Sequence, residues 1–166
     1  MAARRYLIAL GSNVRHPRHG RPDAVLRAAS AALDGHVAAR VVALSPIIAS
    51  APLGPSRRRY ANAACLIETT LAPDALLDGL KALERRFGRT RGGQRWSSRV
   101  LDLDIVLWQE GAWSSPGLVV PHVAFRSRTF VLGPATAIAP RWRDPITGLS
   151  LRHLLKRLTR PRPTPR

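Results

Sequence analysis

A chain of 166 residues with a formal net charge of +17 is most simply one domain, large enough to bury a substantial core. Cys65 is the only cysteine, so no intrachain disulfide can form and a disulfide-stapled extracellular scaffold is excluded. The chain has no apolar run of about 20 residues and no signal-peptide pattern, which predicts a soluble, cytoplasmic protein. The charge favours an anionic partner, but arginine is abundant throughout, so its local placement is more informative than its total.

The first half of the chain predicts alternating strands and helices. Residues 6–10 form an apolar run that stops at the turn-forming triplet Gly11-Ser12-Asn13, which predicts a strand. Pro22 suits a first helical turn, and apolar residues then recur at helical spacing at Val25, Leu26, Ala29 and Leu33. Two more strands are expected over 37–48 and 62–68, separated by an irregular loop over 51–59. Cys65 lies in the third strand, where we expect a buried thiol.

A second helix and a fourth strand complete this pattern. The helix follows Pro73 and ends at Gly88, and its apolar face comprises Leu76, Leu77, Leu80, Leu83 and Phe87. The fourth strand is expected within residues 99–108. The order strand, helix, strand, strand, helix, strand predicts an α+β fold with a ferredoxin-like βαββαβ core, an antiparallel sheet with helices packed on it.

We interpret the last third of the chain as additions to this core. Its structured segments are expected over 118–121 and 128–138, followed by a helix over 151–158. Residues 159–166 alternate Arg and Pro without apolar side chains, which predicts disorder. We therefore expect one domain over 1–158 and a disordered tail over 159–166.

Asp102 and Asp104 carry the strongest chemical signal in the fourth strand. Side chains two apart on a strand share a face, with Cα atoms about 7 Å apart. Like charges this close raise each other's pKa unless a cation lies between them, and Mg²⁺ takes oxygen ligands of this kind. The pair is either a metal platform or two solvated carboxylates on an exposed strand face.

An arginine-rich segment precedes this strand and contains interspersed glycines. Its basic residues are Arg85, Arg86, Arg89, Arg91, Arg95 and Arg99. Guanidinium groups match phosphate oxygens in a bidentate way, and Mg²⁺ bridges phosphate oxygens to carboxylates. The segment and the aspartates together predict a site for a metal-bound polyphosphate, unless the arginines form an ordinary solvated loop.

A series of short motifs occurs in order between about residue 6 and residue 140. The motifs are Gly11-Ser12-Asn13, Pro52-Leu53-Gly54, Tyr60-Ala61-Asn62, Leu83-Glu84, Gly88-Arg89, Arg95-Trp96, Arg99, Leu101-Asp102-Leu103-Asp104-Ile105, Pro121-His122 and Arg128-Thr129-Phe130. This ordered series resembles the 6-hydroxymethyl-7,8-dihydropterin pyrophosphokinase family of folate biosynthesis.

The resemblance implies transfer of the β,γ-diphosphate of ATP to the pterin hydroxymethyl oxygen, with release of AMP. It implies two Mg²⁺ ions bound by Asp102 and Asp104, with Arg89 and Arg99 as further catalytic residues. ATP is the co-substrate, and the implied nucleotide contacts are Glu84, Arg91, Arg95, Trp96, Ile105, His122 and Arg128. The implied pterin contacts are Ser50, Pro52, Leu53, Tyr60, Asn62 and Phe130. Tyr60 and Phe130 are similar to the two rings that sandwich the heterocycle, and Asn62 to the amide that bonds its edge.

Each of these residues also has an ordinary structural interpretation. Taken singly, Phe130 could be core, Tyr60 a strand-end aromatic and Asn62 a turn residue. The chain also departs from the family pattern, because Ser50-Ala51 replaces a frequent Thr-Pro pair and Val123 lacks a polar or aromatic group common after the histidine. None of these departures removes a residue that the chemistry requires.

Two rival functions remain open at this point. A ferredoxin-like sheet with a strongly positive charge could bind single-stranded nucleic acid, but uncompensated carboxylates would repel a phosphate backbone. A related enzyme could use a different hydroxylated acceptor. We expect a monomer that acts on small molecules, with neither nucleic acid nor membrane as a partner.

Overall fold

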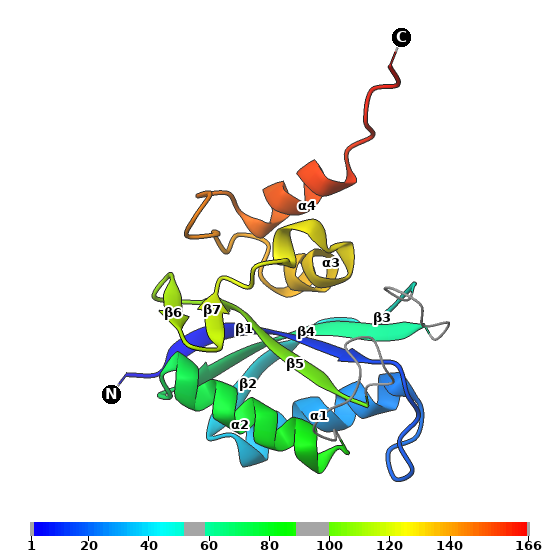
Figure 1. Cartoon of the computed structure of the whole chain (residues 1–166), viewed down its shortest axis with the longest axis vertical. Coiled ribbons are helices and arrows are strands. Elements are labelled where there is room, and N and C mark those ends of the chain that lie inside the picture. The colour runs from blue at the N-terminus through cyan, green and yellow to red at the C-terminus, as the bar shows by residue number, and fades with distance from the viewer. Residues whose placement is uncertain (1, 52–58, 89–99, 166) are drawn as a thin grey trace.

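An antiparallel sheet forms the centre of the structure (Figure 1). The computed structural model describes residues 2–51, 59–88 and 100–165. The main strands run in the order β2-β4-β1-β5, and β3 continues along the edge of β4 that β2 occupies. The strands are β1 (Arg4–Ser12), β2 (Ala39–Leu44), β3 (Ile48–Ser50), β4 (Tyr60–Thr69) and β5 (Asp102–Trp108).

Two helices complete the expected βαββαβ order and confirm the ferredoxin-like α+β fold. Helix α1 (Pro22–His36) joins β1 to β2, and α2 (Pro73–Arg86) joins β4 to β5. Both helices carry a proline in the first turn. Gly88 follows α2 with φ of 100°, and its N–H bonds the Arg85 carbonyl over 3.0 Å. Its lack of a Cβ permits this left-handed turn, which explains why the helix ends where the sequence predicted.

One predicted strand is divided in the structure. The expected strand over 37–48 is two strands, β2 and β3, and a bulge interrupts β2 between Val41 and Ala43. Ser45 lies between them, where its N–H bonds the Ala64 carbonyl and its Oγ accepts the Ala64 N–H. Pro46 follows and has no N–H to continue the ladder. The chain therefore bends before it pairs again as β3.

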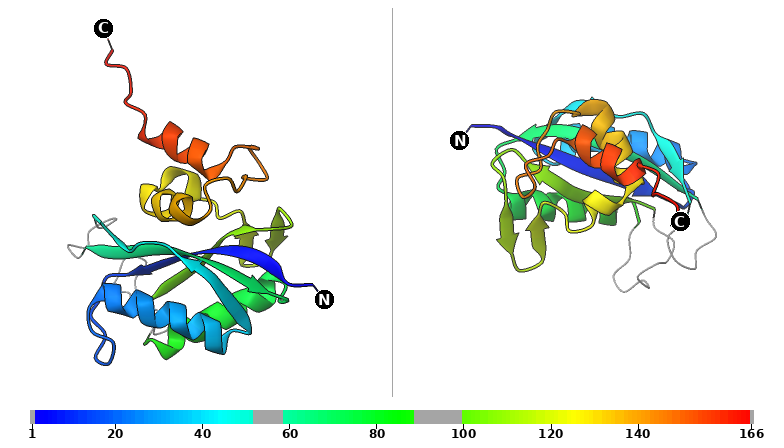
Figure 2. Two further views of the ribbon diagram at one scale, coloured as in Figure 1. Left: turned by 180° about the vertical axis from the view of Figure 1, so that it is seen from behind. Right: turned by 90° about the horizontal axis from the view of Figure 1, so that it is seen from above.

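The two faces of the sheet carry separate apolar clusters. On one face, side chains such as Ile8, Cys65 and Leu103 pack with residues of α1 and α2. Cys65 is buried as expected, and burial raises the pKa of its thiol to about 11. On the other face, Leu7 and Val106 pack with residues of the C-terminal additions. Helices therefore cover both faces of the sheet, as the views in Figure 2 also show.

The C-terminal additions form the second helical layer. Their elements are β6 (Trp113–Ser115), β7 (Leu118–Val120), the short 3₁₀ helix η1 (Phe125–Ser127), α3 (Thr129–Ile138) and α4 (Leu151–Thr159). Helix α3 lies on the sheet and α4 packs outside it (Figures 1 and 2), so the predicted helix over 151–158 is confirmed. Beyond α4, the described residues 160–165 contain neither helix nor strand and extend away from the body. The division into a domain and a disordered tail stays a prediction.

A buried aspartate ties these additions together. Asp144 is completely buried and accepts hydrogen bonds from Arg126 Nε over 2.6 Å and Nη2 over 2.8 Å. It also accepts from the Thr147 hydroxyl and the Ile146 N–H. These bonds anchor the turn between α3 and α4 to η1. Because η1 lies between His122 and Arg128 in the chain, they also support the segment that carries those residues.

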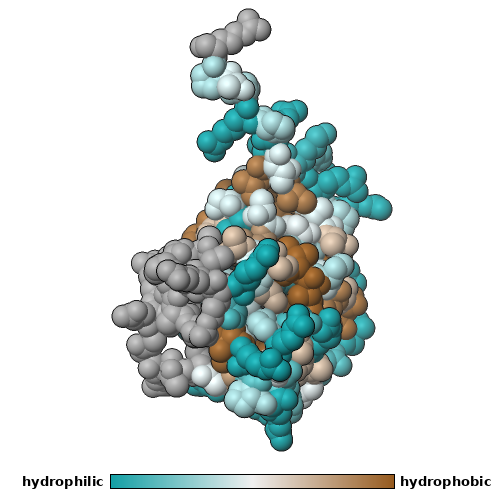
Figure 3. Space-filling model, turned by 90° about the vertical axis from the view of Figure 1, so that its right-hand side faces the viewer, coloured by the Kyte–Doolittle hydropathy of each residue, from teal (hydrophilic) through white to brown (hydrophobic). Residues whose placement is uncertain are grey.

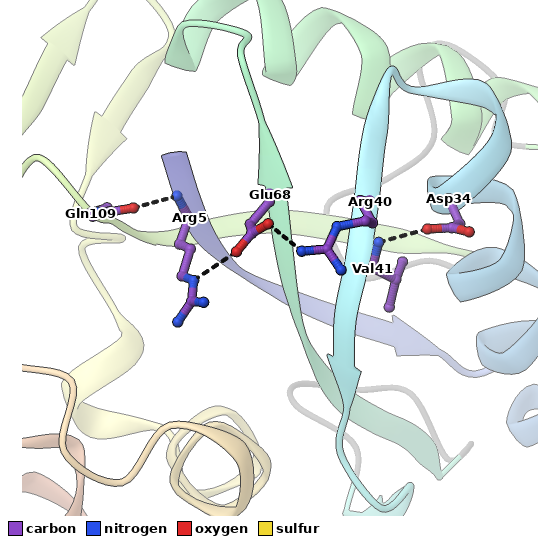
Figure 4. Close-up of polar contacts among 6 residues, drawn as sticks. All are labelled: Arg5, Asp34, Arg40, Val41, Glu68 and Gln109. Atoms are coloured by element: carbon purple, nitrogen blue, oxygen red, sulfur yellow. Dashed lines mark hydrogen bonds and ion pairs between the residues drawn. The ribbon is translucent and has the colours of Figure 1, made fainter. Parts of the chain in front are cut away.

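An ion-pair ladder crosses the end of the sheet at which β1 begins (Figure 4). Glu68 on β4 lies opposite Arg5 on β1 and Arg40 on β2, and it binds both guanidinium groups. The hydrogen bonds from these two arginines hold the pKa of Glu68 below its usual value, and the bond from Arg40 has the larger effect. Backbone N–H groups at the same end bond Asp34 and Gln109. Cross-strand pairs of this kind favour one strand register.

On the face drawn in Figure 3, hydrophobic areas lie between hydrophilic side chains. Among the residues that the structure describes, the exposed large hydrophobic side chains are Val42, Ile48, Val119, Val123 and Ile146. No helix within the described ranges is both long enough and apolar enough to cross a bilayer.

Candidate active site

A cavity of about 300 Å³ lies at the end of the sheet opposite the Glu68 ladder. It is formed where the end of β1 and the starts of β4 and β5 approach α3 and the segment before it. Its lining combines aromatic rings, an amide, carboxylates, a histidine and an arginine. The lining residues are Ala9, Leu10, Gly11, Ser50, Ala51, Tyr60, Asn62, Asp102, Asp104, His122, Arg128, Phe130 and Val131.

Strand β5 directs both aspartates toward this cavity. Asp102 pairs with Gly11 and Asp104 pairs with Ala9 in the register of β1 and β5. Leu103 and Ile105 point the other way, into the core beneath α1 and α2. The predicted alternation is therefore present from Asp102 to Ile105, although a bulge at Val106 ends it, and the two carboxylates share one face and one cavity. The Asp104 side chain is 51% exposed, so its oxygens are accessible to a ligand.

Glu84 of α2 supports this strand from the core side. Its carboxyl group is buried, and Oε1 accepts a hydrogen bond from the Leu103 N–H over 2.8 Å. Leu103 lies between the two aspartates. Glu84 is not among the residues that line the cavity, so its described contact is with the aspartate strand itself.

His122 lies beside Asp104 in a defined orientation. Its Nδ1 accepts the Ala124 N–H over 3.1 Å, so the neutral ring carries its proton on Nε2. Nε2 is 4.0 Å from Asp104 Oδ2. Burial lowers the pKa of His122, Asp104 partly offsets this, and Arg128 lowers it further. His122 therefore offers an N–H donor to the cavity without a positive charge at neutral pH.

The opposite side of the cavity is suited to a flat heterocycle. Tyr60 and Phe130 supply aromatic rings, and the Arg128 guanidinium lies 5.7 Å from the centroid of the Phe130 ring. Asn62 is 5% exposed, and its Nδ2 donates to the Ser50 hydroxyl over 2.6 Å. The cavity thus joins a stacking site and a polar edge to the carboxylate pair.

Several expected contacts cannot be placed in this geometry. Ile105 is 2% exposed and its side chain belongs to the core, so only its backbone could meet a nucleotide. Other predicted residues lie outside the described ranges: Arg89, Arg91, Arg95, Trp96, Arg99, Pro52 and Leu53. Their assigned roles stay predictions.

Some residues that line the cavity could not be identified as site residues from the sequence. Ala9, Leu10 and Val131 are apolar residues of β1 and α3, and they border the cavity through the strand register and the helix position. Only knowledge of which strands are neighbours could have identified them. Gly11 was visible as part of a turn triplet, but its place opposite both Asn62 and Asp102 follows from the pairing of β1.

Comparison with known proteins identifies the family. The family model described as 7,8-dihydro-6-hydroxymethylpterin-pyrophosphokinase (HPPK) matches residues 7–140. The chain belongs to this family. A 2-amino-4-hydroxy-6-hydroxymethyldihydropteridine pyrophosphokinase of Pseudomonas aeruginosa is 42% identical over 142 residues, which cover 85% of this chain and 84% of that protein. The protein of the same name from Haemophilus influenzae is 40% identical over 133 residues, which cover 80% of this chain and 79% of that protein.

Solved structures of the HPPK family share the fold. The crystal structure of Plasmodium falciparum HPPK-DHPS wild type matches with a TM-score of 0.72 and 10% identity, over 93% of this chain. This chain spans 41% of that longer protein. At such low identity the likeness is evidence for the fold alone.

Family membership confirms the activity expected from the sequence. The chain is an ATP-dependent pyrophosphokinase of folate biosynthesis, a transferase whose acceptor is 6-hydroxymethyl-7,8-dihydropterin.

Proposed function

We propose that the cavity bordered by β5 and α3 is the active site, and that its two sides bind the two substrates. The hydroxymethyl oxygen of the pterin attacks the β-phosphorus of ATP and loses its proton, the bond from that phosphorus to the α,β-bridging oxygen breaks, and AMP leaves. The observation that carries this proposal is the shared cavity, since Asp102 and Asp104 border the same space as Tyr60 and Phe130.

The carboxylate pair fits Mg²⁺ as its metal. Within the described ranges no group of three or more His, Cys, Asp or Glu side chains could hold an ion, so the carboxylates described at this cavity are a pair and not part of a larger cluster. Mg²⁺ is commonly bound by one or two carboxylates, with waters and substrate phosphates as its remaining ligands. We propose that Asp102 and Asp104 hold two such ions. When bound, the ions would neutralise phosphate charge and keep the attacking and leaving oxygens in line.

The surrounding cationic and neutral donors are proposed to bind the triphosphate. His122 donates its Nε2–H to a phosphate oxygen, and Arg128 offers a guanidinium from the start of α3. Arg89 and Arg99 are proposed as catalytic cations, with Arg91, Arg95 and Trp96 as further nucleotide contacts. For Glu84 we propose an indirect contribution, through its bond to the strand of the aspartates. For Ile105 we propose a contact between its backbone and the nucleotide.

The other side of the cavity is proposed to bind the pterin. Tyr60 and Phe130 stack on its two faces, which buries apolar ring surface. Asn62 bonds the polar edge, so a ring without complementary groups leaves a buried amide unsatisfied and binds weakly. Ser50, Pro52 and Leu53 complete this side in the proposal.

The test is the release of AMP from ATP by the purified chain. We expect AMP formation only when both the hydroxymethylpterin and Mg²⁺ are present, in equal amount to the diphosphorylated pterin. AMP release that is independent of the pterin, or equal with a simple primary alcohol, would overturn the proposed acceptor site. An RNA that binds the chain without any such reaction would favour the nucleic-acid alternative.

The same proposal describes a monomer in the cytoplasm without a nucleic-acid or membrane partner. It is supported by the small size of both substrates, neither of which requires a nucleic acid or a membrane for its binding. Sedimentation equilibrium at assay concentrations tests the monomer directly.

A further inference from the structure

Arg126 and Asp144 form a forked ion pair that the proposed chemistry does not use. Arg126 lies in η1, and its Nε and Nη2 donate to the two carboxylate oxygens of Asp144 over 2.6 and 2.8 Å. The Asp144 side chain is completely buried, and neither residue is among those that line the cavity. A forked pair fixes direction as well as distance, because its two bonds must be aligned at the same time.

The remaining anchor of η1 is apolar. Phe125 is completely buried and belongs to the same apolar cluster as Leu151 and Leu154 of α4. Apolar packing is non-directional, so it holds the turn against the protein more firmly than it sets the rotation of the turn. The directional bond from η1 to the connection between α3 and α4 is the one that Arg126 makes to Asp144.

The η1 turn leads to the ring of His122 through Ala124. The Ala124 carbonyl accepts the Ser127 N–H over 3.2 Å and the Ser127 hydroxyl over 3.0 Å, so the position of Ala124 follows that of the turn. The Ala124 N–H donates to His122 Nδ1 over 3.1 Å. Because this bond requires Nδ1 without a proton, it places the proton of the neutral ring on Nε2.

This arrangement controls the ring of His122 separately from its main chain. The His122 N–H bonds the Val106 carbonyl of β5 over 3.0 Å, which fixes the backbone to the sheet. The ring is directed by the Ala124 N–H, and its Nε2 lies 4.0 Å from Asp104 Oδ2, beside the cavity that both residues line. A shift of η1 would therefore change which way the Nε2–H points while the backbone of His122 stayed in place.

We infer that Arg126 is a positioning residue for ATP, which acts through η1 and the Ala124 N–H to hold His122 with its Nε2–H directed into the cavity. This inference rests on the proposed function, because that proposal assigns the Nε2–H to a phosphate oxygen of ATP. Asp144 serves as the fixed anchor for the Arg126 guanidinium.

The pterin side of the cavity is held independently of η1. Tyr60 and Asn62 lie on β4, within the sheet. Phe130 lies in α3, whose buried Val131 and Leu132 belong to the apolar cluster on that face of the sheet. Loss of the ion pair should therefore weaken ATP binding and leave pterin binding unchanged.

The experiment compares two variants of Arg126 with a matched control. Arg126→Met removes all donors, and Arg126→Lys retains the charge without the planar fork. The control is Thr147→Val, because the Thr147 hydroxyl donates to the same Asp144 carboxylate over 2.7 Å but does so from the connection between α3 and α4. Its loss disturbs the anchor without releasing η1. The measurements are kcat, the KM for each substrate, and the Kd of the pterin and of a non-hydrolysable ATP analogue, each determined by calorimetry.

Arg126→Met should raise the KM for ATP and the Kd of the analogue by about tenfold, as expected when one hydrogen bond to a charged group is lost. Arg126→Lys should raise both constants by a smaller factor. The Kd of the pterin should stay unchanged in both variants, and Thr147→Val should leave all of these constants unchanged.

Nitrogen-15 spectra of the His122 ring provide a readout that a general loss of stability would not change. They are recorded without substrates in mildly alkaline solution, where histidine rings are neutral. The wild-type chain should show Nδ1 without a proton and Nε2 with one. Arg126→Met should add a population with the proton on Nδ1, and Thr147→Val should not.

An unchanged KM for ATP, or unchanged ring signals, in a folded Arg126→Met variant would overturn the inference. Equal effects of Thr147→Val, or an equal loss of pterin binding, would also overturn it, because Arg126 would then have a general structural role. Should Arg126→Met fail to fold, Arg126→Lys is judged by the same results. Failure of the proposed function is distinguishable, because the wild-type chain itself would then release no pterin-dependent AMP.

Discussion

The Glu84 carboxylate accepts a hydrogen bond from the backbone N–H of Leu103 over 2.8 Å. Leu103 separates Asp102 from Asp104, so one buried side chain of α2 holds the backbone between the two proposed metal ligands. The bond joins the backbone of β5, an edge strand of the sheet, to α2, which packs on the core face, while the aspartate side chains lie on the cavity face. Helix α2 therefore fixes the position of the carboxylates without lining the cavity.

Replacement of Glu84 should separate this support from nucleotide contact. Glu84→Ala leaves the Leu103 N–H buried without this acceptor, which should lower the free energy of unfolding by about 1–3 kcal/mol. Glu84→Gln retains an oxygen acceptor and should lose less than half as much. Urea unfolding measures both values. Equal losses in the two variants would show that the bond to Leu103 does not contribute.

The Asp144 network should make stability depend on acidity at low pH. Burial alone would raise the pKa of Asp144, but its bonds to Arg126, Thr147 and the Ile146 N–H lower it to about 2, from an ordinary value of 3.8. The folded chain thus binds this proton less readily than the unfolded chain. The resulting stabilisation is present above pH 3.8 and is lost as the pH falls toward 2.

We therefore expect Asp144→Asn to lower the free energy of unfolding by roughly 2 kcal/mol near neutral pH. The difference in unfolding free energy from the wild-type chain should shrink as the pH falls toward the pKa of Asp144 in the folded chain. Asp78→Asn, at an exposed position of α2, serves as the control and should have little effect. A loss with Asp144→Asn that stays constant down to pH 2 would contradict this ionic origin.

His16 should give a second pH dependence at a different part of the chain. Its Nδ1 accepts the N–H groups of Arg18 and His19 over 3.0 and 3.1 Å, and a protonated ring could accept neither. Burial, then His19 and Arg18, lower the pKa of His16 below its ordinary 6.5. The contribution of His16 to stability is therefore complete above pH 6.5, and it is lost as the pH falls through the lower pKa that His16 has in the folded chain.

His16→Asn retains a side-chain acceptor but does not titrate. We expect the difference in free energy of unfolding between this variant and the wild-type chain to change with pH, in favour of the variant as the solution becomes acidic. Chemical denaturation at several pH values below and above 6.5 measures that difference. A difference that is the same at every pH would contradict the role assigned to His16 Nδ1.

The parts of the fold that the sequence predicted well are those with strong periodic burial. Alternation around Asp102 and Asp104 identified β5, and apolar residues at helical spacing identified α1 and α2. The division of the second strand was missed because the bend depends on Ser45 bonding Ala64, a partner 19 residues away. Strands β6 and β7 have three residues each, too few for a periodic signal.

The motifs predicted which side chains would lie together, but not the contacts that depend on the backbone or on distant partners. Ser50, Asn62, Asp102 and His122 all meet at one cavity, as the motifs suggested. The bond from Leu103 to Glu84 and the burial of Asp144 involve contacts that no local spacing encodes. Helix α3 contains Pro134, a residue that usually ends a helix, so its type could not be inferred from the sequence pattern.

The central claim is that Asp102 and Asp104 hold two metal ions. Binding of Mn²⁺ in place of Mg²⁺ tests this claim most directly, because the paramagnetic signal of Mn²⁺ allows the bound ions to be counted. With a non-hydrolysable ATP analogue and the pterin present, the wild-type chain should bind two ions. Asp102→Asn and Asp104→Asn should each lose bound metal and lower turnover by about a hundredfold or more, with the fold intact. The matched Asp78→Asn variant should bind and turn over as the wild-type chain does. If both active-site variants still bound two ions with unchanged affinity, the carboxylate pair would not be the metal site and the account would be wrong.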